Sequence, residues 1–184
     1  GGGVLRSGGV QWMTAGRGIV HSEMPEQEKG LLWGFQLWVN LSADEKMCAP
    51  CYREIASVKI PKVTRDDGVR IKVIAGELDG ITGAVNRIAV SPSFMDVALP
   101  AGCTFTHQFP MGHAAFTYVF EGAAEVGKGI EAHTVRRGQI AVFGPGDEAH
   151  LSADETPARV LLAAGRPHRE PIVRYGPFVM NTRE

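Results

Sequence analysis

The sequence predicts an all-β fold of the barrel or sandwich type. Short strand-like segments recur along the chain, and turn motifs such as Asp66-Asp67-Gly68 and Glu121-Gly122 separate them. Glycine and proline are abundant, with 23 and 11 copies among 184 residues, as expected where tight turns are frequent. No convincing amphipathic helix pattern occurs in the sequence.

The first two expected strands lie near the N-terminus. One is the apolar run that follows Gly9 and ends at the Ala15-Gly16 turn. The second is 32–40 (LWGFQLWVN), in which Gly34 suggests a bulge or a close backbone approach. Its apolar residues alternate with period two, as in a strand with two different faces, at Trp33, Phe35, Leu37 and Val39.

Further strands are expected along the rest of the chain. Val69–Ala75 alternates between apolar and basic residues, which indicates a half-exposed strand. The others are Val85–Val90, Phe94–Leu99, Phe116–Phe120, Ile140–Phe143 and Arg159–Ala163. The polar stretch 42–56, which contains Pro50, is typical of a connector. A weak internal duplication, in which a glycine, an apolar strand and a glycine turn precede His21 and again His150, favours two barrels.

Charge and cysteine content exclude several classes of function. The formal net charge of −1 gives no electrostatic basis for binding nucleic acid or an anionic membrane surface. No apolar run approaches the roughly 20 residues that a membrane span needs. Three cysteines, an odd number, do not suggest a secreted disulfide framework. We therefore expect a cytoplasmic protein, or a nuclear one if the source is eukaryotic.

His21-Ser22-Glu23 is the clearest local motif. On a strand, residues two apart point to the same face, so His21 and Glu23 can converge on one point. An imidazole and a carboxylate are ligands of mononuclear non-haem metal sites. The alternative is a hydrogen-bonded or solvated pair, which the spacing alone favours because the tripeptide is common.

Other reactive side chains allow two interpretations each. His107, His113 and His150 can be ligands of a second metal, but no His-x-His or His-x-Glu spacing recurs there, so ordinary polar residues are favoured. His133 and His168 are expected to be exposed.

Cys48 and Cys51 form a CxxC motif, either a redox dithiol or half of a zinc site, and two unpaired thiols are favoured. Four aromatic residues can line a flavonoid-sized pocket or pack in the core, namely Trp12, Trp33, Phe35 and Trp38.

Longer segments resemble the pirin family. Residues 10–25 (VQWMTAGRGIVHSEMP) are similar to the signature segment of that family almost without departure. Four further segments resemble pirin segments in the same order along the chain: 34–41 (GFQLWVNL), 116–122 (FTYVFEG), 170–173 (EPIV) and 176–182 (GPFVMNT).

The resemblance implies a double cupin, with two stacked antiparallel β-barrels of which the first is incomplete. The expected domains are 1–45 for the remainder of the N-terminal barrel, 46–60 for a linker, 61–165 for the C-terminal barrel, and 166–184 for a segment packing back toward the first barrel.

The resemblance also implies a metal site and an activity. Pirins hold a mononuclear metal, usually iron, on three His and one Glu, and several open the flavonol quercetin with dioxygen. His21 and Glu23 match the family's His-x-Glu pair, and Glu23 is also the candidate base that removes the flavonol proton. The implied cofactor is Fe(II), and the implied partners are a flavonol-like substrate and dioxygen. The alternatives are a metal- or redox-dependent regulator of a protein partner, without turnover, or an inactive remnant.

One departure from the family concerns the other two ligands. The sequence contains no His-x-His pair, which the resemblance places upstream of Gly1. Family members also continue beyond Glu184 into a short helical segment. We therefore expect weak or absent metal binding and little dioxygenase activity in this chain, and strand exchange or a dimer can complete the barrel.

Overall fold

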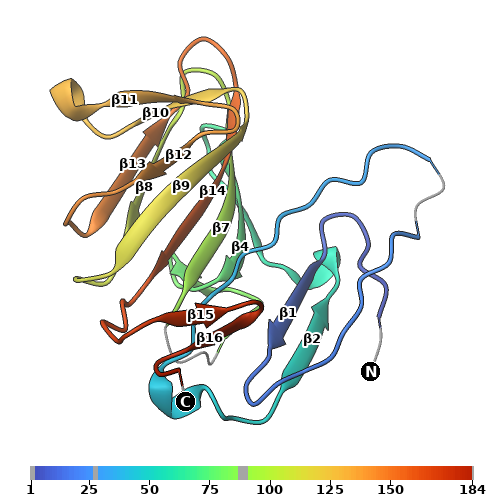
Figure 1. The fold of residues 1–184 in the computed structure, drawn as a ribbon. Helices are drawn as coiled ribbons and strands as arrows, with labels where there is room; N and C mark the ends of the chain where they lie inside the picture. The colour runs from blue at the N-terminus through green and yellow to red at the C-terminus, as the bar shows by residue number, and fades with distance from the viewer. Residues whose placement is uncertain (1–2, 27–28, 87–90, 184) are drawn as a thin grey trace. The chain divides into compact units, whose positions relative to one another are not determined.

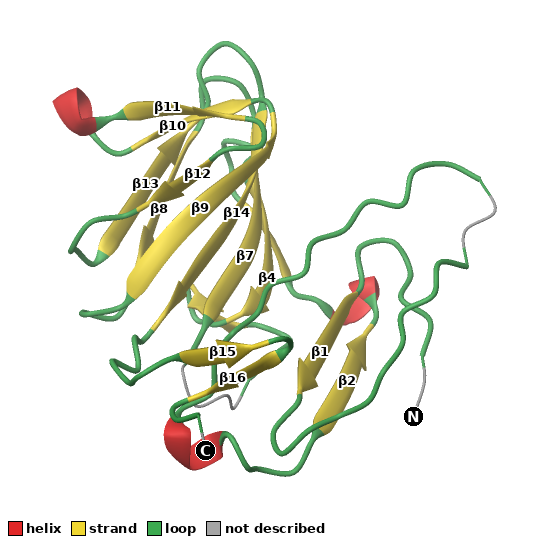
Figure 2. Ribbon diagram, viewed as in Figure 1, coloured by secondary structure: helices red, strands yellow, loops and turns green. Residues whose placement is uncertain are grey.

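The computed structural model describes residues 3–26, 29–86 and 91–183. Within these ranges the secondary structure consists of β-strands and three short 3-10 turns, without an α-helix (Figures 1 and 2). The predicted all-β class is therefore confirmed. The chain divides into two compact units, Gly1–Trp12 with Glu54–His168, and Met13–Arg53 with Arg169–Glu184.

The first unit contains a barrel made of two antiparallel sheets. In order across the larger sheet, the strands are β12 (Ile140–Val142), β9 (Ala114–Glu121), β14 (Ala158–Gly165), β7 (Ser93–Leu99), β4 (Arg70–Ala75) and β3 (Lys62–Thr64). The smaller sheet has the order β11 (His133–Arg136), β10 (Ala123–Val126), β13 (Glu148–Ser152) and β8 (Thr104–Gln108). A small hairpin is formed by β5 (Glu77–Leu78) and β6 (Ile81–Thr82).

The barrel core follows from the period-two side-chain alternation of its strands. In β7 the fully buried residues Met95, Val97 and Leu99 alternate with half-buried ones. Val97 lies opposite Val160 of β14 on one side and Ile71 of β4 on the other, so apolar side chains form a continuous row across the sheet. This core gives the barrel its rigidity.

Five of the predicted strands are confirmed with small shifts of their ends, namely β4, β7, β9, β12 and β14. The predicted strand 85–90 lies partly outside the described residues, since 87–90 are not described. Its first residue, Val85, forms an isolated parallel bridge with Ala75. The polar strand β8 and the short hairpins were not predicted, because their sequences lack a long apolar alternation.

In the second unit, hydrogen bonds that involve side chains join residues 40–46 to the C-terminal segment. The C-terminal part of this unit forms a hairpin of β15 (Val173–Tyr175) and β16 (Phe178–Met180). The Lys46 Nζ donates to Asn40 Oδ1 at 2.7 Å and to the Val179 carbonyl at 2.9 Å. The Ala43 amide, at the start of the 3-10 turn Ala43–Glu45, donates to Glu170 Oε2 at 2.8 Å. Residues 40–46 are thereby bonded to the C-terminal segment.

Two further strands, β1 (Val10–Thr14) and β2 (Cys51–Ile55), pair with each other. Strand β1 matches the expected strand before the Ala15-Gly16 turn. Strand β2 and the whole 3-10 turn Ser57–Lys59 lie inside 46–60, the segment predicted as a linker. The predicted domain boundaries stay a prediction.

The predicted strand over 32–40 is wrong. The segment forms no strand, and none of the described strands pairs with it. A strand needs a neighbour to satisfy its backbone amides and carbonyls, so alternation alone does not produce one. Trp33, Phe35 and Trp38 are 49%, 45% and 59% exposed, so they are not core residues. Trp12, by contrast, packs on a core cluster.

None of the helical turns in the described ranges is long and apolar enough to cross a membrane.

Candidate functional site

His21 and Glu23 lie close together on a loop that follows β1. The distance from His21 Nδ1 to Glu23 Oε1 is 3.9 Å, and their side chains are 43% and 63% exposed. The residues from 15 to 26 form no strand, so the pair converges on a loop and not on the strand that the spacing suggested. The arrangement brings an imidazole and a carboxylate to one solvent-facing point.

The donor chemistry of this pair suits a first-row transition metal, but the donor number does not. One imidazole and one carboxylate are two of the ligands in a 2-His-1-carboxylate site. In the part of the chain that the structure describes, no three residues among His, Cys, Asp and Glu are grouped to hold a metal ion. The described residues therefore do not make up a complete mononuclear site.

Three of the histidines in the first unit, His150, His113 and His133, lie in different surroundings. His150 Nδ1 is 3.1 Å from the hydroxyl oxygen of Thr106, its neighbour across the β13–β8 pair. His113 lies in the loop before β9 with its Nδ1 buried and unbonded, and burial, followed by the charge of Arg166, lowers its pKa. His133 is exposed at the start of β11. None of these three histidines belongs to a group of three or more described His, Cys, Asp or Glu residues that could hold a metal ion.

His107, which the sequence pattern favoured as an ordinary polar residue, lies in surroundings that the sequence did not predict. It lies on β8 and is only 8% exposed, against the Phe105 ring at 6.2 Å and the Phe109 ring at 4.8 Å between centroids. Burial lowers the pKa of His107, while the charge of Asp79 raises it and that of Arg65 lowers it. The imidazole is thus held neutral at neutral pH.

A cavity of about 750 Å³ opens beside His107. The β5–β6 hairpin, the start of β7 and the end of β8 line it. The sequence signal that could have predicted this site is the alternation of Phe105, His107 and Phe109. It places a polar residue between two aromatic ones on the inward face of a strand. Polar residues at such positions need a structural or functional reason.

The cysteines are all free thiols. Cys51 is exposed at the start of β2, whereas Cys48 and Cys103 are partly buried. The Cys103 thiol donates to the Asp67 carbonyl at 3.2 Å. The unpaired state of Cys48 and Cys51 agrees with the favoured interpretation of the CxxC motif.

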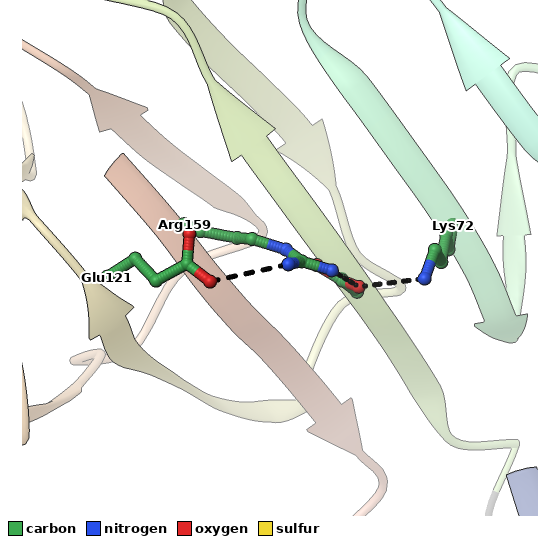
Figure 3. A network of polar contacts seen from close by, with 4 residues as sticks. Lys72, Glu121 and Arg159 are labelled. Carbon is green, nitrogen blue, oxygen red and sulfur yellow. Dashed lines mark hydrogen bonds and ion pairs between the residues drawn. The ribbon is translucent and has the colours of Figure 1, made fainter. Parts of the chain in front are cut away.

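The largest charged network lies on the six-stranded sheet. Figure 3 shows Arg159 in direct contact with Glu121 and, on its other side, with a fourth residue that Lys72 also contacts. The ion pairs identify this fourth residue as Asp96. The hydrogen bonds from Arg159 to Asp96 raise the pKa of Arg159. The network does not line the cavity beside His107, and its four residues lie on four neighbouring strands of the sheet.

Comparison with known proteins gives the family. The model of the pirin family matches residues 1–39, and the model of the pirin C-terminal cupin domain matches residues 94–184. The chain is 46% identical over 189 aligned residues to a Pseudomonas aeruginosa protein that carries the provisional name quercetin 2,3-dioxygenase, covering 99% of this chain and 65% of that protein. It is 49% identical to a pirin-like protein of Caulobacter vibrioides, covering 99% of this chain and 64% of that protein.

The fold comparison agrees with this. A crystal structure of a quercetin 2,3-dioxygenase from Acinetobacter baumannii matches 100% of this chain and 64% of its own, with a TM-score of 0.82 and 30% identity. The double-cupin prediction is therefore confirmed. The chain spans somewhat less than two thirds of the length of these relatives. On these matches, the chain belongs to the pirin family of cupin proteins.

Proposed function

We propose that the protein represented by this chain uses a mononuclear non-haem metal, iron in the first instance, to open a flavonol with dioxygen. The observation that carries this proposal is the 3.9 Å approach of His21 and Glu23 inside the segment that the pirin family model matches. The names of its Pseudomonas and Acinetobacter relatives support quercetin as the flavonol.

In this proposal His21 and Glu23 supply half of the ligand set. Two exposed donors hold a divalent ion weakly, because each missing ligand removes a bond and leaves water in its place. We therefore expect this chain alone to bind iron weakly or not at all and to consume little flavonol. The carboxylate of Glu23, whose side chain is 63% exposed, is also the candidate base for the flavonol proton.

A second candidate function is metal- or redox-dependent binding of a protein partner, without turnover. The observation that favours it is the exposed apolar segment 31–39, which includes Leu32 at 68% and Trp38 at 59% exposure. Large exposed apolar patches mark contact surfaces in soluble proteins. A second copy of the chain, exchanging strands with the first, would use the same surface.

Anaerobic calorimetric titration with Fe(II) or Mn(II) tests the ligand assignment. We expect weak heats without saturation at micromolar protein, and a further loss in Glu23→Ala but not in the control Glu26→Ala, an exposed carboxylate near the pair. A tight 1:1 site in this chain would overturn the half-site assignment. Metal binding that is equal in both variants would remove Glu23 from the ligand set.

Quercetin consumption under air, with and without added iron, separates the enzyme from the binding protein. Little turnover is expected from this chain. The ligand set is tested further by reading the coding sequence upstream of Gly1. An in-frame His-x-His there would supply the two further imidazoles. A longer chain that contains this pair and still leaves quercetin unchanged in the presence of iron would refute the dioxygenase proposal.

A further inference from the structure

The residues that line the cavity beside His107 do not include His21 or Glu23. The lining includes two carboxylates, two hydroxyls and two aromatic rings, those of Glu77, Asp79, Thr82, Ser93, His107 and Phe109. All of these residues belong to the first unit, so the cavity is a feature of the barrel itself. Its volume of about 750 Å³ lies within the range of ordinary small-molecule sites.

The His107 imidazole is available to a ligand in this cavity. Neither ring nitrogen of His107 forms a hydrogen bond with a described residue. Among the described side chains, the fully buried polar atom that lacks a partner is His113 Nδ1, not a nitrogen of His107. Because His107 lines the cavity, a ligand there can reach its ring. A neutral imidazole offers one donor and one acceptor there.

The charge of the cavity selects against anions. Asp79 forms an ion pair with Arg65 at 3.2 Å, which compensates its charge. Glu77 also lines the cavity; it is exposed and has no ion pair with a described residue. A carboxylate of this kind accepts hydrogen bonds from hydroxyl groups and repels a negatively charged ligand.

The remaining walls favour a flat ring. The Phe109 ring, 8% exposed, meets the His107 ring edge to face at an interplanar angle of 86°. A third ring can stack on such a pair with a favourable quadrupole alignment. The described residues at this place do not form a group of three metal ligands, so an organic ligand suits the lining better than an ion.

We propose that this cavity is a second small-molecule site of the protein, which binds a neutral hydroxylated aromatic ring of the catechol type. The ring packs against Phe109, one hydroxyl donates to the Glu77 carboxylate, and the other exchanges a hydrogen bond with the His107 imidazole. The site does not depend on the proposed function, because none of its residues belongs to the His21–Glu23 pair.

Ligand-observed NMR with catechol, kept reduced by ascorbate under nitrogen, tests the proposal on the full chain without added metal. We expect saturation transfer to the catechol protons and a shift of the His107 ring-proton resonance, assigned by its loss in His107→Phe. Glu77→Gln, at an exposed position, should weaken binding about fivefold, because a neutral amide oxygen accepts a weaker hydrogen bond than a carboxylate does. The matched control Glu131→Gln, an exposed carboxylate on another turn, should leave the affinity unchanged.

Three related probes make the assignment specific. Benzoate should bind more weakly than catechol because of Glu77, and trans-1,2-cyclohexanediol should bind more weakly because it lacks the aromatic face. The variant that combines His21→Ala with Glu23→Ala should retain catechol binding. Loss of binding in that variant, equal binding in Glu77→Gln and wild type, or no shift of the His107 resonance would each overturn the proposal.

Discussion

Arg159 donates two parallel hydrogen bonds to Asp96, from Nε to Oδ1 at 2.8 Å and from Nη2 to Oδ2 at 2.7 Å. The two residues lie on adjacent strands, β14 and β7, at diagonal positions of the register. Lys72, opposite Asp96 on β4, and Glu121, opposite Arg159 on β9, extend the contact at 3.6 and 3.4 Å. Four neighbouring strands are thereby joined by charged side chains on one face of the sheet (Figure 3).

Replacing Arg159 by lysine should destabilise the barrel although the charge is kept. Lysine cannot donate two parallel bonds, and Asp96, whose side chain is only 12% exposed, would lose part of its compensation. We expect a loss of about 1–2 kcal/mol in the free energy of unfolding, measured by urea denaturation. The control is Arg70→Lys, at an exposed position of the same sheet. An equal effect of both changes would show that the paired geometry contributes nothing.

Gly122 should be far less tolerant of alanine than Gly102. Both glycines have positive φ, at 68° and 73°. A Cβ on Gly122 would lie 2.1 Å from the Pro157 carbonyl oxygen, whereas nothing lies within 4 Å of a Cβ on Gly102. The strain of positive φ, about 1 kcal/mol, is common to both. Because the backbone must shift, Gly122→Ala should lower the free energy of unfolding by roughly 2 kcal/mol or more beyond the loss in Gly102→Ala. Thermal or urea unfolding measures the difference. Equal losses would contradict the steric argument.

Much of the barrel could be predicted from its sequence because its strands carry apolar residues with period two. Val69–Ala75 and Phe94–Leu99 correspond closely to β4 and β7, whose inward residues are buried on a shared core. Strand β8 (TFTHQ) was not predicted because polar residues occupy four of its five positions. Its inward face is recognisable only once Phe109, beyond the strand, is counted with Phe105 and His107.

For the candidate site, the sequence predicted the pair of residues but not the backbone that holds them. The approach of His21 to Glu23 was expected from spacing, but the strand that was to hold them is absent from the described residues. The segment 32–40 fails for a related reason, since alternation describes what a strand buries and not which neighbour it pairs with. Pairing is a property of the whole sheet, so a local pattern could not reveal it.

Acid should destabilise the protein partly through His107. Burial lowers the pKa of the folded-state imidazole below 6.5, so between that lowered pKa and 6.5 the unfolded chain binds a proton that the folded chain does not. Stability then falls as the pH falls through this window. Asp79 opposes the shift and Arg65 adds to it, and Glu77 also lines the cavity that opens beside the ring.

The measurement is the urea midpoint between pH 7.5 and pH 5. His107→Phe should show a smaller decrease across this range than the wild type. Some decrease should remain, because burial also lowers the pKa of His113. His133→Phe, at an exposed position, is the control and should leave the decrease unchanged. A wild-type slope in His107→Phe would show that this imidazole is not held neutral in the folded chain.

The three cysteines should all react with a thiol reagent in denaturant without prior reduction. In the native chain Cys51 should react first because it is exposed, and Cys103 more slowly because its thiol is partly buried and donates to the Asp67 carbonyl. Cys51→Ser should remove the fast phase. A count of one thiol in the unreduced sample, restored to three by reductant, would instead indicate a disulfide between Cys48 and Cys51.

The exposed apolar segment 31–39 should cause the chain to associate with itself. Leu31, Leu32 and Trp38 are 82%, 68% and 59% exposed. The free energy of the system falls when such apolar surface is removed from water. Sedimentation velocity should therefore show a sedimentation coefficient that rises with protein concentration. Replacing Leu32 and Trp38 together by serine should weaken this rise. Serine at Met111 and Ile130 should not weaken it; these residues are at least as exposed but lie in the loop before β9 and in the 3-10 turn Gly129–Glu131. A concentration-independent monomer, or equal effects of both double variants, would exclude this segment as the contact surface.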